Sequence, residues 1–418
     1  MPTIKYVYAR EILDSRGLPT VECNLWLDTG HQITTSVPTG TSRGKYEAVE
    51  LRDNDKSRMM GQGVLTAVNN VNTIIGPQLI GQDPTKQVEL DQLLLTLDGT
   101  PNKARLGANA ILAVSQATLK AGALISGLPL YNYIHQLFQI PNGLSLPSCV
   151  YTVFNGGKHG AGNLDFQEFQ LIPATNLDFN TSLDIAVTFF AKLGEVLTSK
   201  GAIHSVGITG GYAPNLYNNA DAFEILVEAT KMTPYTYAQD IFFGLDVAAS
   251  QFFSNSKYTL KDKTQPFSSD ELKEYYIKLK NLYHLMYLED PFAEDDRKSW
   301  KELTAAIGEN TSIVGDSLLA TNKDRMIKAQ TEGLCNAILV KPNQVGTILE
   351  TIQVIQQARA ANWQVIISHR SGETTDDFIA DFAVGVNADY VKFGPANRGE
   401  RTVKYNRLLA INQELHQK

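Results

Sequence analysis

Ionisable residues end six successive strand-like segments in the second half of the chain. Short apolar runs such as 242–245 and 285–288 are each followed at once by a titratable side chain. Because segments with helical patterns separate these runs, we expect parallel strands whose carboxyl ends meet at one edge of a sheet. The residues predicted to meet there are Asp246, Glu289, Asp316, Lys341, His369 and Lys392.

Three of these residues are carboxylates from neighbouring predicted strands, namely Asp246, Glu289 and Asp316. Carboxylates gathered at one site repel each other strongly unless a cation lies between them. Oxygen ligands, with no Cys or His nearby in the sequence, suit Mg²⁺ and make zinc a poor fit. The sequence therefore predicts a magnesium site at this edge.

Two lysines complete a plausible reaction centre. Lys341 is a natural base at such a site, where burial and nearby cations favour its free amine. A base beside a metal ion suits removal of a proton α to a carboxylate, because the metal stabilises the charge that develops. Lys392 adds charge stabilisation. The adjacent His369, Arg370 and Ser371 supply donors suited to phosphate, since arginine presents a fork of N–H groups.

The elements that carry these residues indicate two domains. From residue 139 onward, strands alternate with helices, which predicts a (β/α)₈ barrel with its site at the carboxyl ends of the strands. Residues 1–138 differ, because two strands (4–10 and 20–27) precede helical patterns over about 63–134. This order indicates a separate N-terminal α+β domain. The stretch 139–143, QIPNG, is the best linker candidate.

Bulk composition excludes several classes of protein. The 418 residues carry a formal net charge of -7, which argues against non-specific nucleic-acid binding. The N-terminus lacks the apolar core of a signal peptide, and the apolar stretch 108–125 is interrupted by polar residues. We interpret that stretch as a buried core helix and expect no membrane partner. The three cysteines match no metal-ligand spacing, and we expect a cytoplasmic protein.

The order of motifs over essentially the whole chain resembles the enolase (phosphopyruvate hydratase) family. Segments 11–17, EILDSRG, and 105–110, RLGANA, are similar to the family's opening segment and first-domain helix. The predicted barrel carries further similar segments at 245–250, 289–291, 313–316, 341–344 and 368–374. This resemblance implies an enolase-type barrel, a small phosphorylated carboxylic acid as substrate and at least a homodimer.

The resemblance also implies roles for individual residues. Lys341 would remove the C2 proton of 2-phosphoglycerate, and Lys392 would help to stabilise the enediolate. A tightly bound Mg²⁺ would take Asp246, Glu289 and Asp316 as ligands, and a second, substrate-dependent Mg²⁺ would take Ser42. The remaining implied site residues are the phosphate contacts Arg370 and Ser371, the loop residue His159, and Glu168 with its neighbour Gln167 near the substrate hydroxyl. Among the contacts to substrate we also count Ser42, Glu289 and Asp316, and among the catalytic residues His369 and Thr209.

One catalytic motif departs from the family pattern. Where the family reads Val-Gly-Asp-Glu-Gly-Gly, this chain has Ile208 and Thr209 in place of the two acids. Threonine cannot act as the general acid on a departing hydroxyl, a role that typically contributes ~10²–10⁴-fold to the rate. Smaller departures include Leu18, Phe393 and the rearranged 395–397. Basic residues are added at Arg43, Lys45 and Lys158, which would favour a more anionic ligand.

Three functional hypotheses follow. The first is an enolase that converts 2-phosphoglycerate to phosphoenolpyruvate in glycolysis, with activity reduced because of Thr209. The second is a family relative with altered chemistry on a phosphorylated or phosphonate acid, as in carboxyphosphonoenolpyruvate synthase. The third is a non-catalytic binding protein, and the intact lysines and carboxylates count against it.

Overall fold

The N-terminal part combines a three-stranded sheet with a group of helices. The computed structural model describes residues 2–40, 44–160, 164–216 and 218–416. The sheet is an antiparallel meander of β1 (Ile4–Leu13), β2 (Pro19–Leu27) and β3 (Gln32–Ser36), of which the pattern predicted the first two. The helices are α1 (Leu65–Asn70), α2 (Gly76–Leu79), α3 (Gln87–Asp98), α4 (Ala108–Ile125) and α5 (Leu130–Leu137).

Helix α4 is the central helix of this part. It spans the residues that the sequence predicted, and it packs against β2, β3 and α5. By length and composition it could cross a membrane, but 83% of it is buried inside the protein. The apolar character of α4 is therefore explained by its place in the core.

The second part contains a barrel-like sheet. Its strands follow the order β4-β14-β13-β12-β11-β10-β7-β6-β5. Residues 148–155 close the ring, because β4 pairs with β14 while β5, directly after it, pairs with β6. The bounds are β4 (Ser148–Cys149), β5 (Tyr151–Asn155), β6 (Glu168–Pro173), β7 (Ile241–Asp246), β10 (Leu285–Glu289), β11 (Ser312–Gly315), β12 (Ala337–Val340), β13 (Gln364–Ser368) and β14 (Tyr390–Lys392).

One strand runs against the predicted direction. From β7 through β10–β14 to β4 every neighbouring pair is parallel, as expected, but β6 is antiparallel to both β5 and β7. The described residues between β5 and β6 contain no helix, and the antiparallel pairing of the two strands shows that the chain reverses direction between them. The prediction of uniformly parallel strands was therefore wrong at β6.

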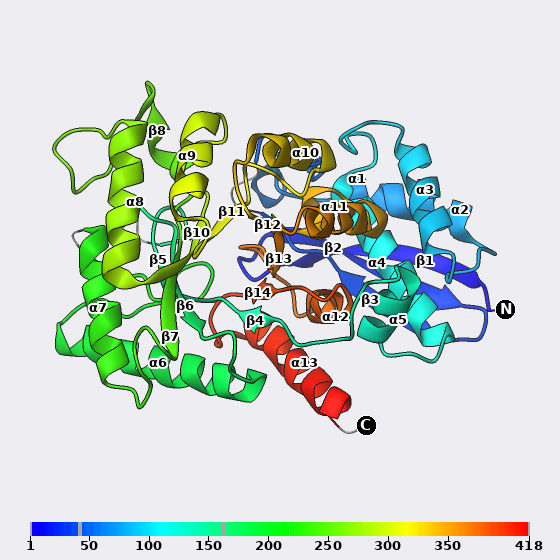
Figure 1. The fold of residues 1–418 in the computed structure, drawn as a ribbon. Coiled ribbons are helices and arrows are strands. Elements are labelled where there is room, and N and C mark those ends of the chain that lie inside the picture. The colour runs from blue at the N-terminus through cyan, green and yellow to red at the C-terminus, as the bar shows by residue number, and fades with distance from the viewer. Residues whose placement is uncertain (1, 41–43, 161–163, 217, 417–418) are drawn as a thin grey trace.

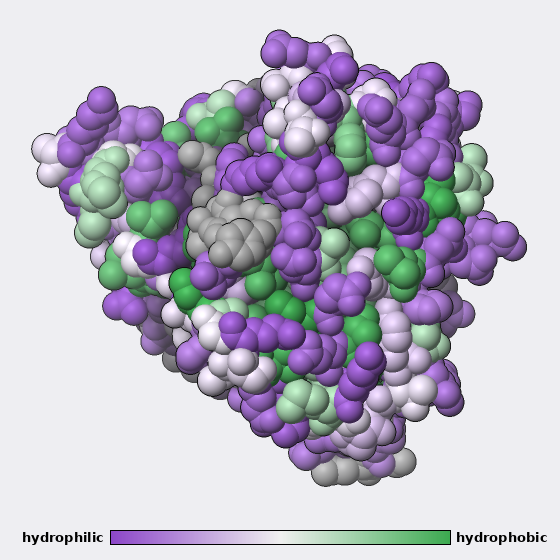
Figure 2. Space-filling model, turned by 90° about the vertical axis from the view of Figure 1, so that its left-hand side faces the viewer, coloured by the Kyte–Doolittle hydropathy of each residue, from purple (hydrophilic) through white to green (hydrophobic). Residues whose placement is uncertain are grey.

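Helices surround this sheet (Figure 1). A small hairpin of β8 (Phe253–Ser254) and β9 (Lys257–Tyr258) precedes α8, whose N-terminus is fixed by a capping box between Ser268 and Glu271. The face in Figure 2 is covered mostly by hydrophilic residues. The helices are α6 (Phe179–Ser199), α7 (Asn219–Lys231), α8 (Ser269–Tyr283), α9 (Arg297–Ile307), α10 (Lys323–Glu332), α11 (Ile348–Ala360), α12 (Phe378–Gly385) and α13 (Gly399–His416).

The two parts are joined by buried polar contacts as well as apolar packing. Helix α5 packs on α12, and α3 on α11. The carboxylate of Asp376, which precedes α12, accepts hydrogen bonds from Lys120 Nζ (2.9 Å), the Ser36 backbone N–H (2.9 Å) and the Thr35 hydroxyl (2.7 Å). We propose the domain boundary between residues 138 and 139, where α5 has ended and no strand has yet begun.

The Asp376 contacts generate a prediction about stability. Burial alone would raise the pKa of Asp376, but Lys120 and the other donors lower it below its ordinary value. We expect Asp376→Asn to destabilise the protein by about 3 kcal/mol, because it leaves buried donors and a cation without their anion. Since the pKa is lowered in the folded state, this difference should be full at neutral pH and shrink below about pH 4. Denaturant unfolding measures it.

The matched control is Lys192→Gln, which removes an exposed ion pair with Glu195. Such a pair contributes at most about 1 kcal/mol. Equal losses in the two variants would mean that Asp376 is not important for docking the two parts together.

Candidate active site

The predicted residues meet at one mouth of the barrel. Strand β6 is antiparallel to β7, so its first residue, Glu168, lies in register with Asp246, the last residue of β7. The loop that carries Thr209 reaches the same mouth because Tyr212 forms a bridge to Phe154 of β5. A single cavity is lined by His159, Gln167, Glu168, Thr209, Asp246, Asp316, Lys341, His369, Arg370, Ser371 and Lys392.

One described residue of the predicted set, Glu289, is not part of that lining. Glu289 is completely buried beneath the cavity and reaches it through Lys392. Ser42 and Arg43 lie outside the described residues. Of the other added basic residues, neither Lys45 nor Lys158 belongs to the described lining of the cavity. The described part of the chain thus gives no support to the expectation of a more basic cavity.

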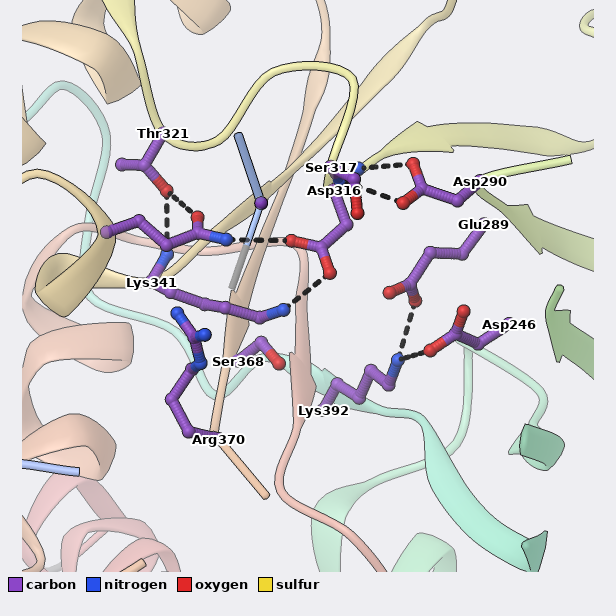
Figure 3. A network of polar contacts seen from close by, with 12 residues as sticks. Asp246, Glu289, Asp290, Asp316, Ser317, Thr321, Lys341, Ser368, Arg370 and Lys392 are labelled. Atoms are coloured by element: carbon purple, nitrogen blue, oxygen red, sulfur yellow. Dashed lines mark hydrogen bonds and ion pairs between the residues drawn. The ribbon is translucent and has the colours of Figure 1, made fainter. Parts of the chain in front are cut away.

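Three carboxylates surround the ammonium of Lys392, and Figure 3 shows two of them, Asp246 and Glu289. Its Nζ lies 2.7 Å from Glu289 Oε2, 2.9 Å from Asp246 Oδ2 and 3.3 Å from Glu168 Oε2. Burial alone would lower the pKa of Lys392, but the surrounding carboxylates raise it well above its ordinary value. Lys392 is therefore a permanent cation in the folded protein.

The second lysine, Lys341, faces Asp316 across the same cavity. Its Nζ lies 2.6 Å from Asp316 Oδ2, and the other oxygen of Asp316 accepts a hydrogen bond from Gln344 Nε2 at 3.0 Å. Burial would raise the pKa of Asp316, but Lys341 lowers it, so this carboxylate is ionised. Asp316 can thus orient the amine of Lys341 toward a molecule in the cavity.

The carboxylates outnumber the two lysines. Burial and the repulsion of Asp246 raise the pKa of Glu289 well above its ordinary value. Burial and the repulsion of Asp316 and Asp246 raise the pKa of Asp290 to about 7. Both shifts come first from burial and then from an excess of buried negative charge. A further cation or further protons would relieve it.

The side chains fit Mg²⁺ by their chemistry. The donors are all oxygen atoms, and Glu289 Oε1 is buried without a hydrogen-bond partner in the described part of the chain. They do not yet form a coordination shell, because within the described ranges no three His, Cys, Asp or Glu side chains are grouped as a metal site. Figure 3 shows why: the Lys392 ammonium lies between Asp246 and Glu289.

Thr209 lies within a closed network of hydrogen bonds. It is completely buried, its hydroxyl accepts a bond from Asn155 Nδ2 at 2.6 Å, and it donates to Glu168 Oε1 at 3.0 Å. His159 Nδ1 lies 3.0 Å from the same oxygen of Glu168, and Thr152 donates to the other oxygen. Burial alone would raise the pKa of Glu168, but Lys392 and His159 lower it well below its ordinary range. Glu168 is therefore an anion and not a proton donor.

The hydrogen-bond donors that follow β13 are partly used by carboxylates of the protein itself. Arg370 Nη1 donates to Glu47 Oε2 at 2.9 Å, and the Arg370 backbone N–H donates to Glu373 at 2.9 Å. Both Arg370 and Ser371 line the cavity. A phosphate bound there would have to share the guanidinium with the carboxylate of Glu47.

Sequence reasoning missed several residues at this site, among them Glu47, Asn155 and Asp290. Glu47 gave no signal, because its partner Arg370 is far away in the sequence. Asn155 lies in the segment 155–159, in which only His159 was identified as a site residue. Asp290 could have been found, since it directly follows Glu289 at the end of a strand, and its side chain accepts the backbone N–H groups of Asp316 and Ser317.

Comparison with known families fits this arrangement. The family model of the enolase N-terminal domain matches residues 4–134, and that of the enolase C-terminal TIM barrel domain matches residues 143–418. The chain belongs to the enolase family. Enolase-family membership confirms the predicted fold class, with an N-terminal α+β domain followed by an enolase-type barrel.

The excess of negative charge generates a prediction about metal. We expect Mg²⁺ to raise the melting temperature by a few degrees relative to a chelator, because an ion that binds only the folded state stabilises it by about 2.7 kcal/mol at a hundredfold excess over Kd. Asp316→Asn should remove most of this difference. Differential scanning calorimetry of the ligand-free protein measures both values.

Asp178→Asn serves as the control. Asp178 is the N-cap of α6, and asparagine caps a helix equally well, so its response to Mg²⁺ should match that of the unmodified protein. Identical melting curves with Mg²⁺ and with chelator in the unmodified protein would contradict a magnesium site.

Proposed function

We propose that the chain is a magnesium-dependent lyase that removes the C2 proton of 2-phosphoglycerate and releases phosphoenolpyruvate, as in glycolysis. The observation that carries this proposal is the pair of lysines in one cavity. Lys341 is oriented by Asp316 and faces the carboxylate group around Lys392. A base opposite a fixed cation suits removal of a proton next to a carboxylate, because the cation stabilises the charge that develops.

Each side chain of the cavity then has a task. Lys341 Nζ accepts the C2 proton, and the Lys392 ammonium stabilises the negative charge on the substrate carboxylate. Arg370 and Ser371 bind the phosphate. Bound Mg²⁺, held by Asp246, Glu289 and Asp316, would supply further stabilisation of negative charge. Ser42 would contribute to a second, substrate-dependent Mg²⁺. The proposal further includes a cytoplasmic homodimer or higher homo-oligomer.

A second candidate keeps the proton removal and changes the later step. The observation that favours it is the contact of Thr209, because the proton of its hydroxyl group is already donated to Glu168. Glu168 itself is held as an anion, so neither residue can protonate a leaving hydroxyl. The alternative substrate would be a related phosphorylated or phosphonate acid, as for a carboxyphosphonoenolpyruvate-synthase-like relative. A purely binding role is the third candidate, and the oriented base counts against it.

The missing acid generates a prediction about rate. Turnover of 2-phosphoglycerate should be slow, and the double change Thr209→Glu with Ile208→Asp should raise kcat by ~10²-fold or more, the usual contribution of a general acid. Phosphoenolpyruvate formation is followed by its absorbance. The matched control is Thr209→Val, which keeps the shape of the side chain without adding an acid and should give no increase. A fast unmodified enzyme, near the median kcat of about 10 s⁻¹, would mean that another group protonates the hydroxyl.

The two half-reactions should also separate. Because the base is intact and the acid is absent, we expect deuterium from D₂O to enter C2 of 2-phosphoglycerate faster than phosphoenolpyruvate accumulates. Proton NMR of the C2 position measures the exchange. Lys341→Ala should abolish it, whereas Thr209→Val should change mainly its ratio to product. Bound substrate without exchange would favour the candidate with a different substrate.

A further inference from the structure

Arg401 of α13 is a completely buried arginine directly behind the site. Its Nη1 donates hydrogen bonds to His369 Nδ1 at 2.6 Å and to the Arg370 carbonyl oxygen at 2.8 Å. Its Nη2 donates to the Ser371 carbonyl oxygen at 2.8 Å. None of the sequence motifs indicated this residue. The side chain of Arg401 therefore holds both the imidazole of His369 and the backbone of residues 370–371.

The contact with His369 determines where the imidazole carries its proton. A guanidinium has only N–H donors and no acceptor, and it stays charged in proteins. His369 Nδ1 must therefore accept, which requires a neutral ring with its hydrogen on Nε2. The ring lines the cavity, and Nε2 has no hydrogen-bond partner among residues 2–40, 44–160, 164–216 and 218–416. Its N–H is available to a bound molecule.

The charges around His369 act in the same direction. Burial and the cation of Arg401 hold the pKa of His369 well below its ordinary value. Lys392 on β14 and Lys341, directly after β12, also disfavour the imidazolium, whereas Glu168 on β6 favours it. A second proton on Nδ1 would in addition point at the Arg401 guanidinium, which cannot accept it.

We propose that Arg401 is a positioning residue that fixes His369 as a neutral imidazole whose Nε2–H donates a hydrogen bond to the ligand in the cavity. His369 then acts as a fixed donor and not as a proton shuttle. In an enzyme whose Thr209 cannot protonate the substrate, such a donor would polarise the group that occupies that end of the cavity. Only the identity of that ligand rests on the proposed function, and the state of the ring does not.

Histidine NMR of the full chain without substrate tests the proposal. The protein has seven histidines, and ¹⁵N-labelling of their rings distinguishes the two neutral tautomers from the imidazolium. We expect one ring to keep the Nε2–H pattern from about pH 5.5 to 8.5, and His369→Gln should remove that signal. A His369 ring that titrates in this range, or that carries its hydrogen on Nδ1, overturns the proposal. Absent turnover of 2-phosphoglycerate would leave this result unchanged.

Two variants of Arg401 separate positioning from a merely structural role. Arg401→Lys keeps a cationic donor and should keep the Nε2–H pattern. Arg401→Met removes this cationic donor, so the ring of His369 should begin to titrate. The rate of deuterium exchange at C2 of 2-phosphoglycerate should then fall at least tenfold below pH 6. If Arg401→Met leaves the His369 ring unchanged and lowers the exchange rate equally at every pH, the positioning role of Arg401 is overturned. If that variant does not fold, the spectrum of the unmodified protein still decides.

Discussion

The buried ammonium of Lys392 is the interaction on which the site depends. A charge without water is stable only when it is paired, and Lys392 is paired with carboxylates from three other strands, β6, β7 and β10. The loss of Lys392 itself would leave these carboxylates without their shared cation. Its contacts connect β14 with β6, β7 and β10 across the interior of the ring.

The same cluster explains why the site calls for a further cation. The Lys341–Asp316 pair satisfies one carboxylate, and Lys392 is shared among three others. Burial and the remaining negative charge raise the pKa values of Glu289 and Asp290. A further cation or further protons at this mouth would relieve that charge, although the described side chains form no coordination shell as they stand. The excess of negative charge calls for a further positive charge. The geometry of a cation site would depend on the group that displaces the Lys392 ammonium.

The strand-end pattern predicted the part of the candidate site in which charged residues directly follow apolar runs, whereas residues such as His159, Glu168 and Thr209 came from the family resemblance. The bounds of α4 and the ends of β7, β10 and β14 lie where the patterns predicted them. The direction of β6 was not predictable in this way, since an apolar run carries no information on whether its partner is parallel. Arg401 was hidden for another reason: a lone arginine in a C-terminal helix resembles a surface residue until the fold brings it behind His369. The assignment of the site as a whole remains a proposal.

The residue at position 209 also affects the neighbouring Glu168. A carboxylate at that position would face Glu168 at hydrogen-bond distance, and two such neighbours cannot both ionise easily, so one would hold a proton. Thr209 places no second acid there, and its hydroxyl donates to Glu168 Oε1. Burial alone would raise the pKa of Glu168, but Lys392 and His159 lower it well below its ordinary range, and no acid at position 209 opposes them. Because the hydroxyl is bonded on both sides, by Asn155 and to Glu168, Thr209 is fully satisfied within this buried network.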